Sequence, residues 1–253
     1  MTELEQLRAE LAEARQRIDG MAAAQEEFLR AVSHDLRAPL RHVTSYGALV
    51  RELLQELDGT PPQVQEALGF LGTMEQSARR MGQMIDGLQA IARVGRAPLA
   101  VQNVDLFEAL REARTALAPQ EAGRSVHWHI DIAPDLPAVR ADAALLAQLL
   151  AQVLGNALKF TRGQAEARID VQAAPGDAGR VVVTVRDNGV GFDGTRAQQL
   201  FGVFQRMHRE ADFEGVGAGL ALCQAIAQRH GATVGIDAAV GQGCTLRLNW
   251  PAA

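Results

Sequence analysis

The first 32 residues repeat an apolar side chain at steps of three and four, in a strict seven-residue pattern. The seam falls at Leu4, Leu7, Leu11, Ala14, Ile18, Met21, Gln25, Phe28 and Val32, with Gln25 as its one polar position. A seam sustained at this spacing predicts a two-stranded coiled coil, because each helix buries such a narrow stripe only against a second helix.

A second apolar seam continues directly from the first. Its positions are Leu36, Leu40, Val43, Gly47, Val50, Leu54 and Leu57. The two steps that join the seams, from Phe28 to Val32 and from Val32 to Leu36, are both four residues long. Such a stutter locally unwinds a coiled coil. It falls at His34, so we expect rotation or unwinding of the coiled coil to change the helix geometry around this histidine.

Residues 58–62 read Asp-Gly-Thr-Pro-Pro, which is a strong turn signal because proline can only begin the next helix. A second helix is expected from this turn to about Arg93. Its apolar or small positions are Val64, Ala67, Leu71, Met74, Ala78, Met81, Ile85, Leu88 and Ala92. Two hairpins with one apolar stripe on each helix bury all their stripes in a four-helix bundle. A homodimer is the expected result.

The helical pattern breaks at residues 95–98, and the remainder alternates helix and strand. Helices are expected at 106–117, 143–160 and 218–230, and strands at 126–132, 167–173, 180–186, 233–237 and 244–250. This order predicts an α/β sandwich domain. The expected organisation is a coiled-coil linker at 1–24, an all-α dimeric hairpin at 25–95 and an α/β domain at 100–253.

The formal net charge of -5 provides no broad positive field, so duplex nucleic acid and anionic membrane surfaces are poor partners for this chain. No run approaches the roughly 18 consecutive apolar residues of a membrane helix, so no direct membrane span is expected. The two cysteines, Cys223 and Cys244, have no metal-ligand spacing and indicate a reducing, cytoplasmic setting. Any sensor domain is expected outside this chain.

The sequence around His34 reads Ser-His-Asp-Leu-Arg-Ala-Pro-Leu at 33–40. His34 lies off both seams and should face solvent, where an imidazole nitrogen can attack a phosphate. A hydrogen bond from its Nδ1–H to Asp35 would leave Nε2 free for the attack. Pro39 would bend the helix just beyond. Taken alone, a surface histidine beside an aspartate is more often a solvated helix face.

Asn156 and Lys159 are three residues apart on the expected helix at 143–160 and therefore share a face. An amide oxygen can ligate Mg²⁺ and an ammonium group can meet phosphate oxygens, which suits a nucleotide triphosphate. An ordinary capped helix end is the alternative for this segment on its own.

Residues 187–192 read Asp-Asn-Gly-Val-Gly-Phe directly after an expected strand. Asp187 can accept a hydrogen bond from the amino group of adenine, while Gly189 and Gly191 let the backbone approach the base. A turn of this kind is a weak signal by itself, because a plain loop uses the same residues.

Three glycines, Gly215, Gly217 and Gly219, open the expected helix at 218–230. Their N–H groups and the helix dipole can form a cradle for phosphate. A single glycine-rich turn is again weak evidence of function.

Together, these four motifs resemble the phosphoacceptor, N, G1 and G2 boxes of sensor histidine kinases, in the order of that family. The resemblance implies phosphorylation of His34, with Asp35 as its activating acid. Many members carry Thr or Asn where this chain has Ala38, and that residue helps to dephosphorylate the partner. Ala38 therefore favours net kinase activity.

The resemblance also implies roles for the nucleotide-binding residues. Asn156 would hold Mg²⁺, Lys159 would touch phosphate and Asp187 would read adenine. Residues 200–204 resemble the F box that borders a mobile ATP lid, and we expect Arg206 of that lid to approach the γ-phosphate. Family members often have Asn in place of Gln152, which leaves its part in the magnesium shell open.

The function expected from this resemblance is that of an ATP:protein-histidine phosphotransferase, which passes its phosphoryl group to an aspartate of a response regulator receiver domain. Residues 41–46 and 213–215 are also similar to transmitters of bacterial phytochromes. The alternatives are an ATPase or serine kinase that shares the nucleotide fold, and a pseudokinase that only dimerises. The other histidines are expected to be structural or surface residues: His42, His127, His129, His208 and His230.

Overall fold

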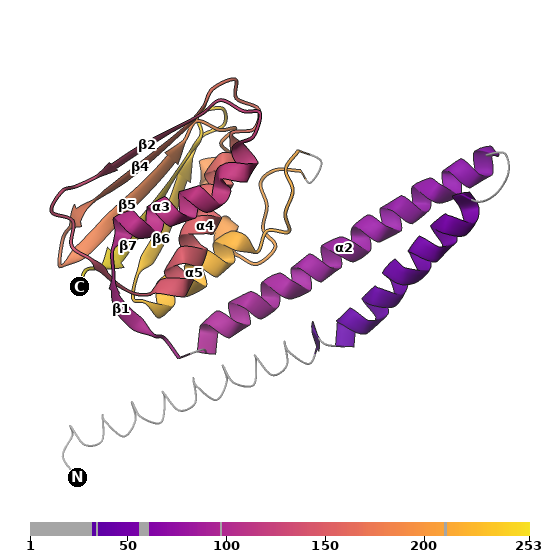
Figure 1. Ribbon diagram of the computed structural model, residues 1–253, viewed down its shortest axis with the longest axis horizontal. Coiled ribbons are helices and arrows are strands. Elements are labelled where there is room, and N and C mark those ends of the chain that lie inside the picture. Colours follow the sequence, from indigo (N-terminus) through magenta and orange to yellow (C-terminus); the bar gives the residue numbers. More distant parts are fainter. Residues whose placement is uncertain (1–31, 34, 56–60, 97, 210–211) are drawn as a thin grey trace, which may run out of the picture. The chain divides into compact units, whose positions relative to one another are not determined.

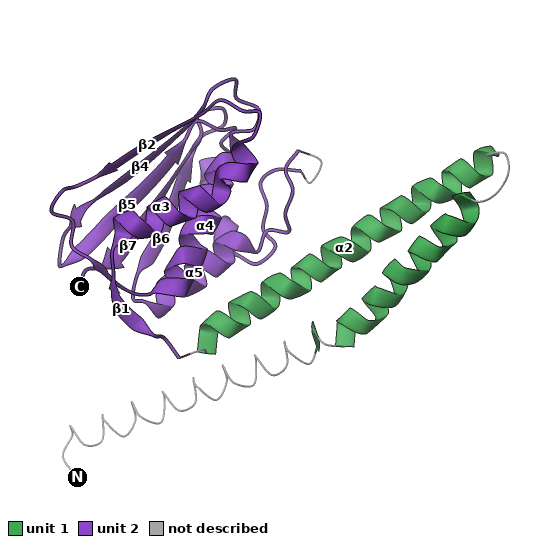
Figure 2. Ribbon diagram, viewed as in Figure 1, with its two compact units in different colours: residues 1–96 green, residues 97–253 purple. Residues whose placement is uncertain are grey.

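The computed structural model describes residues 32–33, 35–55, 61–96, 98–209 and 212–253 (Figure 1). The chain divides into two compact units, Met1–Arg96 and Ala97–Ala253 (Figure 2). The coiled-coil seam up to Ala31, the turn residues 58–60 and His34 lie outside the described residues.

The first unit is a helical hairpin, as predicted. Its first helix is described at 35–55, and its second helix, α2 (Pro62–Arg96), begins at the second proline of the turn. Arg37 ties the two helices together, because its guanidinium donates to Asp86 at 2.6 Å and to Gln89 at 2.8 Å. Nearer the turn, Arg51 donates to both carboxylate oxygens of Glu75, at 3.2 and 3.0 Å.

A single hairpin leaves much of its apolar surface exposed to solvent. The side chains buried on α2 are those of Leu71, Ala78, Ile85 and Val94, at intervals of seven or nine residues. Large apolar side chains remain exposed on both helices: Val32, Leu36, Val43, Tyr46, Leu49, Val50, Leu53, Phe70, Met74 and Met81. Exposed apolar surface on this scale is typical of a protein interaction face.

The second unit is built on a five-stranded mixed sheet with the order β2-β4-β5-β7-β6. The strands are β2 (Val126–Ile132), β4 (Ala167–Gly176), β5 (Arg180–Asp187), β6 (Thr233–Ala238) and β7 (Cys244–Pro251). β2 and β4 are parallel, and the other neighbouring pairs are antiparallel. A separate antiparallel pair joins β1 (Val101–Val104) to β3 (Val139–Asp142), neither of which the sequence pattern predicted.

Three helices, α3 (Leu106–Leu117), α4 (Ala143–Phe160) and α5 (Gly219–Arg229), lie against one face of the sheet (Figure 1). The bounds of α3 and α4 confirm the prediction, and α5 is one residue shorter than expected at each end. Two short 3-10 helices, Ala118–Glu121 and Gly194–Phe201, complete the unit. The arrangement confirms the predicted α/β sandwich.

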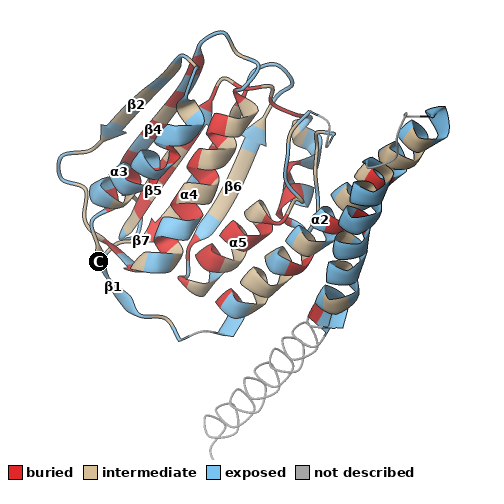
Figure 3. Cartoon of the chain, turned by 45° about the vertical axis from the view of Figure 1, so that its right-hand side comes forward, coloured by how far each residue is buried: buried red, intermediate tan, exposed pale blue. Residues whose placement is uncertain are grey.

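The core of this unit lies between the helices and the sheet (Figure 3). α4 lies at its centre and contributes seven buried residues, including Leu149, Leu150 and Leu154. Among the described helices, α4 is long and apolar enough to cross a membrane by length and composition. Here, however, its apolar side chains pack against the sheet and its two neighbouring helices, as expected of the central helix of a layered domain.

Candidate functional site

The C-terminal half of α4 presents the predicted pair of Asn156 and Lys159. Asn156 is half-buried, and its Oδ1 lies 3.4 Å from Nε2 of Gln152, one turn earlier. The ammonium group of Lys159 donates to the main-chain oxygen of Glu214 at 3.3 Å and lies 4.3 Å from the centroid of the Phe160 ring. Burial lowers the pKa of Lys159, which the Glu214 carboxylate partly opposes.

Asp187 ends β5 with its carboxyl group buried. The amide of Gly189 donates to its Oδ1 at 2.8 Å. Burial raises the pKa of this carboxyl to about 6, although the amides of Gly189 and Cys244 pull it in the opposite direction. A buried acceptor at the end of a strand suits the reading of a nucleobase edge.

The glycines after Asp187 are required by the protein's own backbone. A Cβ on Gly189 would lie 2.6 Å from the main-chain oxygen of Phe160, and a Cβ on Gly191 only 1.9 Å from that of Ala239. Gly191 also has a positive φ of 57°. The sequence predicted glycines that make room for a base, whereas the structure adds close packing of the turn against α4 and the loop after β6.

The glycines at the start of α5 also lie where neighbouring atoms leave no room for a side chain. Gly217 has a φ of 77°, and a Cβ there would lie 2.7 Å from the main-chain oxygen of Gln205. A Cβ on Gly219 would lie 2.3 Å from Nε2 of Gln152. Ala218 gives no side-chain hydrogen bond to the N-terminus of α5. The first amides of this helix thus keep the polarity that attracts an anion.

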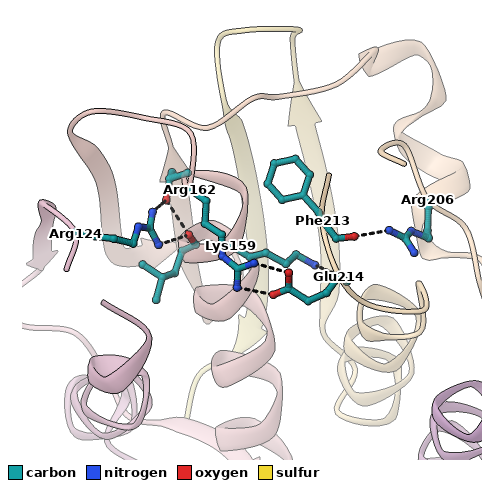
Figure 4. Close-up of polar contacts among 8 residues, drawn as sticks. Arg124, Lys159, Arg162, Arg206, Phe213 and Glu214 are labelled. Carbon is teal, nitrogen blue, oxygen red and sulfur yellow. Dashed lines mark hydrogen bonds and ion pairs between the residues drawn. The ribbon is translucent and has the colours of Figure 1, made fainter. Parts of the chain in front are cut away.

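The predicted lid residue Arg206 is held by the main chain that follows it. Its guanidinium donates to the carbonyl oxygen of Phe213 at 2.6 Å (Figure 4). It also donates to the carbonyl oxygen of Gly215. Glu214, between these two residues, forms a two-pronged ion pair with Arg162, just beyond α4. The segment at 212–215, named here the docked arm, is therefore tied to the end of α4.

Three aromatic rings pack together where the docked arm meets α4. The centroids of Phe160 and Phe213 are 5.0 Å apart, and the His208 ring lies 5.3 Å from each of them. Burial lowers the pKa of His208, an effect that Asp212 opposes. Tilted ring contacts at these distances add to the contact area that holds the arm.

The structure thus gathers Lys159, Arg206 and Gly215 at the docked arm, while Gln152 links Asn156 to Gly219. Asp187 and Gly189 lie at the end of β5, where the turn packs against the main chain of Phe160. Asp35 belongs to the other unit, and His34 lies outside the described residues. No role at the site was assigned from the sequence to four residues that take part in it: Phe160, Arg162, Phe213 and Glu214. Each of the four lies within three residues of a predicted site residue, and this closeness in the sequence is the signal that could have identified them.

The donors here fit a magnesium ion that arrives with a nucleotide. Among the described residues, no group of three or more His, Cys, Asp or Glu side chains is arranged to hold a metal. Mg²⁺ is often held by few protein oxygens together with waters and substrate phosphates. The half-buried amide oxygen of Asn156 is suited to such a shared shell.

Two protein families match the chain. Residues 24–97 match the His Kinase A (phospho-acceptor) domain. Residues 141–253 match the family of histidine kinase-, DNA gyrase B- and HSP90-like ATPases. The first match contains the predicted nucleophile His34, and the second contains every predicted nucleotide-binding residue.

Two curated relatives align with nearly the whole chain. The methanogenesis regulatory histidine kinase FilI of Methanothrix harundinacea is 28% identical over 98% of this chain and 27% of its own length. Cyanobacterial phytochrome A of Nostoc sp. is 29% identical over 96% of this chain and 30% of its own length. The chain therefore spans less than a third of either relative.

A solved structure, full-length ShkA in complex with AMPPNP, superposes on 90% of this chain and 46% of ShkA, with a TM-score of 0.63 and 27% identity.

Proposed function

Because the chain is a transmitter module of the sensor histidine kinases, we propose that it transfers the γ-phosphate of ATP to His34 and then to an aspartate of a response regulator. One observation carries this proposal above the others. The phosphoacceptor match at 24–97 encloses His34, and the same chain gathers Lys159, Arg206 and three glycines in its ATPase-like unit.

ATP would lie between α4, the end of β5 and the start of α5. The Asp187 carboxylate would accept a hydrogen bond from the adenine amino group, beside the turn of Gly189 and Gly191. Lys159 and Arg206 would meet the phosphates, with the amides at Gly215, Gly217 and Gly219 beneath them. Phosphoryl transfer depends mainly on positioning and charge neutralisation, and these residues supply both.

Asn156 would give its amide oxygen to Mg²⁺, whose charge would neutralise that of the phosphates when it is bound. Gln152 donates towards the same oxygen at 3.4 Å and so helps to orient it. The chain itself keeps this amide half-buried and bonded to Gln152, whose own amide lies against Gly219 at the start of α5.

At the phosphoacceptor, the lone pair on Nε2 of His34 would form the N–P bond as the bond from the γ-phosphorus to the bridging oxygen breaks. ADP leaves with that electron pair. Asp35 would accept the Nδ1–H hydrogen bond and stabilise the charge that develops on the ring. Ala38 supplies no hydroxyl or amide near His34, which favours net kinase activity over dephosphorylation.

The functional unit would be a homodimer. Within the residues that the structure describes, the hairpin exposes ten large apolar side chains, including Leu53 at 64% and Phe70 at 64%. Pairing two hairpins would bury these side chains in a four-helix bundle, continuous with the proposed coiled coil at 1–24. An upstream sensor domain outside this chain would then act through that coiled coil.

The module would work in the cytoplasm, where ATP is available and the two free cysteines, Cys223 and Cys244, stay reduced. A pseudokinase is disfavoured because Asn156, Lys159 and the glycines of both turns are all present. An ATPase or serine kinase is distinguished by the chemical nature of the product.

The stability of the phosphoryl linkage tests the proposal. Purified chain incubated with Mg²⁺ and γ-labelled ATP should retain the label in alkali and lose it in acid, as phosphohistidine does. Label that survives acid would indicate a phosphoserine or phosphothreonine instead, and nucleotide hydrolysis without labelled protein would indicate an ATPase.

A further inference from the structure

The docked arm accepts hydrogen bonds from Lys159 and Arg206, the two cationic residues that the proposed function assigns to phosphate. Glu214 contributes two different groups to this contact. Its carboxylate pairs with the guanidinium of Arg162, and its main-chain oxygen accepts from the ammonium of Lys159 at 3.3 Å (Figure 4). A single residue thus satisfies both cationic groups at the end of α4.

An arginine side chain binds a carboxylate and a phosphate in the same way, by donating two parallel hydrogen bonds. The Glu214 carboxylate consequently stands where a phosphate oxygen pair would be bound by Arg162. Lys159 and Arg162 both donate to Glu214, so an anion at this position would meet both side chains.

The arm is held by more than this one residue. Phe213 packs against Phe160 and His208, and its carbonyl oxygen accepts from Arg206 at 2.6 Å. The Arg162–Glu214 pair itself is exposed, at 46% and 61% of the two side chains. Exposed pairs of this kind are weak, so a more highly charged anion can displace the carboxylate.

We propose that Glu214 is an internal competitor for the triphosphate: it occupies Arg162 and Lys159 until nucleotide displaces it, after which Arg162 binds phosphate. This inference rests on the proposed function, because it needs a triphosphate to compete with. It adds Arg162 to the phosphate-binding residues and makes Glu214 a regulatory residue that weakens nucleotide binding.

The direct test is the affinity of variants for ATP in the presence of Mg²⁺, measured by calorimetry on the full chain. Glu214→Gln should tighten binding about two- to fivefold, since it removes a weak exposed ion pair. Arg162→Gln should weaken binding, and Glu214→Gln should give no gain in the Arg162→Gln background. The affinity for adenosine, which has no phosphate, should not change.

Glu108→Gln is the matched control. Glu108 forms an ion pair of similar exposure with Arg111 on α3, and its loss should leave ATP affinity unchanged. The proposal is overturned if Glu214→Gln binds ATP as the wild type does or more weakly, or if Arg162→Gln binds it more tightly.

Amide hydrogen exchange separates this inference from the proposed function. In the nucleotide-free chain, residues 212–215 should exchange faster in Glu214→Gln than in the wild type, because the arm loses an anchor. A chain that binds no nucleotide would overturn the proposed function and the competition together. Unchanged exchange with intact ATP binding would overturn the competition alone.

Discussion

The main-chain amide of Asp142 donates a hydrogen bond of 3.0 Å to Nε2 of His230, which lies 88 residues further along the chain. Nδ1 of the same ring lies 2.8 Å from the carbonyl oxygen of Ile226. The first bond requires Nε2 to accept, so Nδ1 carries the proton. Because Asp142 caps α4 and His230 caps α5, one imidazole fixes together the two helices that carry the candidate site.

Replacing His230 should destabilise the second unit without changing its surface. His230→Phe keeps a ring against Trp250, 4.9 Å away, but removes both hydrogen bonds. We expect a loss of about 1–3 kcal/mol in the free energy of unfolding, because a partly buried amide and a buried carbonyl lose their partner. Chemical denaturation measures it. His129→Phe, at an exposed position, should change stability far less; equal losses would contradict the proposed tie.

Gly191→Ala should both destabilise the second unit and abolish ATP binding. Its Cβ would lie 1.9 Å from the Ala239 oxygen, at a φ of 57° that L-residues rarely adopt. Gly179→Ala is the matched control, since its φ is 68° and nothing lies within 4 Å of its Cβ. The control should lose about 1–2 kcal/mol from backbone strain alone and keep its ATP affinity. Calorimetry and thermal unfolding report both quantities, and two variants that behave alike would refute the steric explanation.

Acidification should weaken nucleobase binding through Asp187. Burial raises the pKa of this carboxyl from 3.8 to about 6, so it becomes protonated as the pH falls from 7 to 5 and accepts hydrogen bonds less well. The same protonation favours the folded state, because the folded chain binds this proton more tightly than the unfolded chain. Adenosine affinity should therefore fall while this group's contribution to stability rises.

Asp187→Asn provides the control for this pH dependence. Adenosine avoids the titration of phosphate, and its binding to the variant should be weak and independent of pH in this range. A wild type whose adenosine affinity is flat between pH 7 and 5, or a variant with the same slope as the wild type, would contradict the role of Asp187.

A charge on the exposed apolar stripe of the hairpin should break the proposed dimer. Leu53→Glu and Phe70→Glu each replace an apolar side chain that is 64% exposed in the single chain with a carboxylate. Burying that charge between hairpins is costly, so the mass in light scattering should shift towards the monomer. Glu52→Gln, on the neighbouring exposed position, should stay dimeric. Dimers that persist in both glutamate variants would place the interface elsewhere.

Much of the fold was predictable because its periodicity is local. α4 was predicted from the apolar face in its own sequence, and β5 was predicted from a run of valines, which the sheet buries. β1 and β3 were missed because each has only four residues and pairs with a distant segment, a contact that no local pattern reveals.

The candidate site divides in the same way. Asn156, Lys159 and Asp187 could be proposed from residue type and spacing. The ion pair between Glu214 and Arg162 could not be predicted, because it joins residues 52 apart and depends on the path of a loop. The close approach of Gly191 to Ala239 is also set by the packing of two turns and not by either sequence.

The central claim is that His34 receives the γ-phosphate of ATP, and the most direct test locates that phosphate. Wild type and His34→Ala should be incubated with Mg²⁺ and γ-labelled ATP, and the wild-type site mapped by mass spectrometry under neutral conditions. We predict one acid-labile phosphate, on His34, and none on the variant, which should still bind ATP with unchanged affinity. Equal labelling of His34→Ala, or a phosphate mapped to another side chain, would contradict the claim.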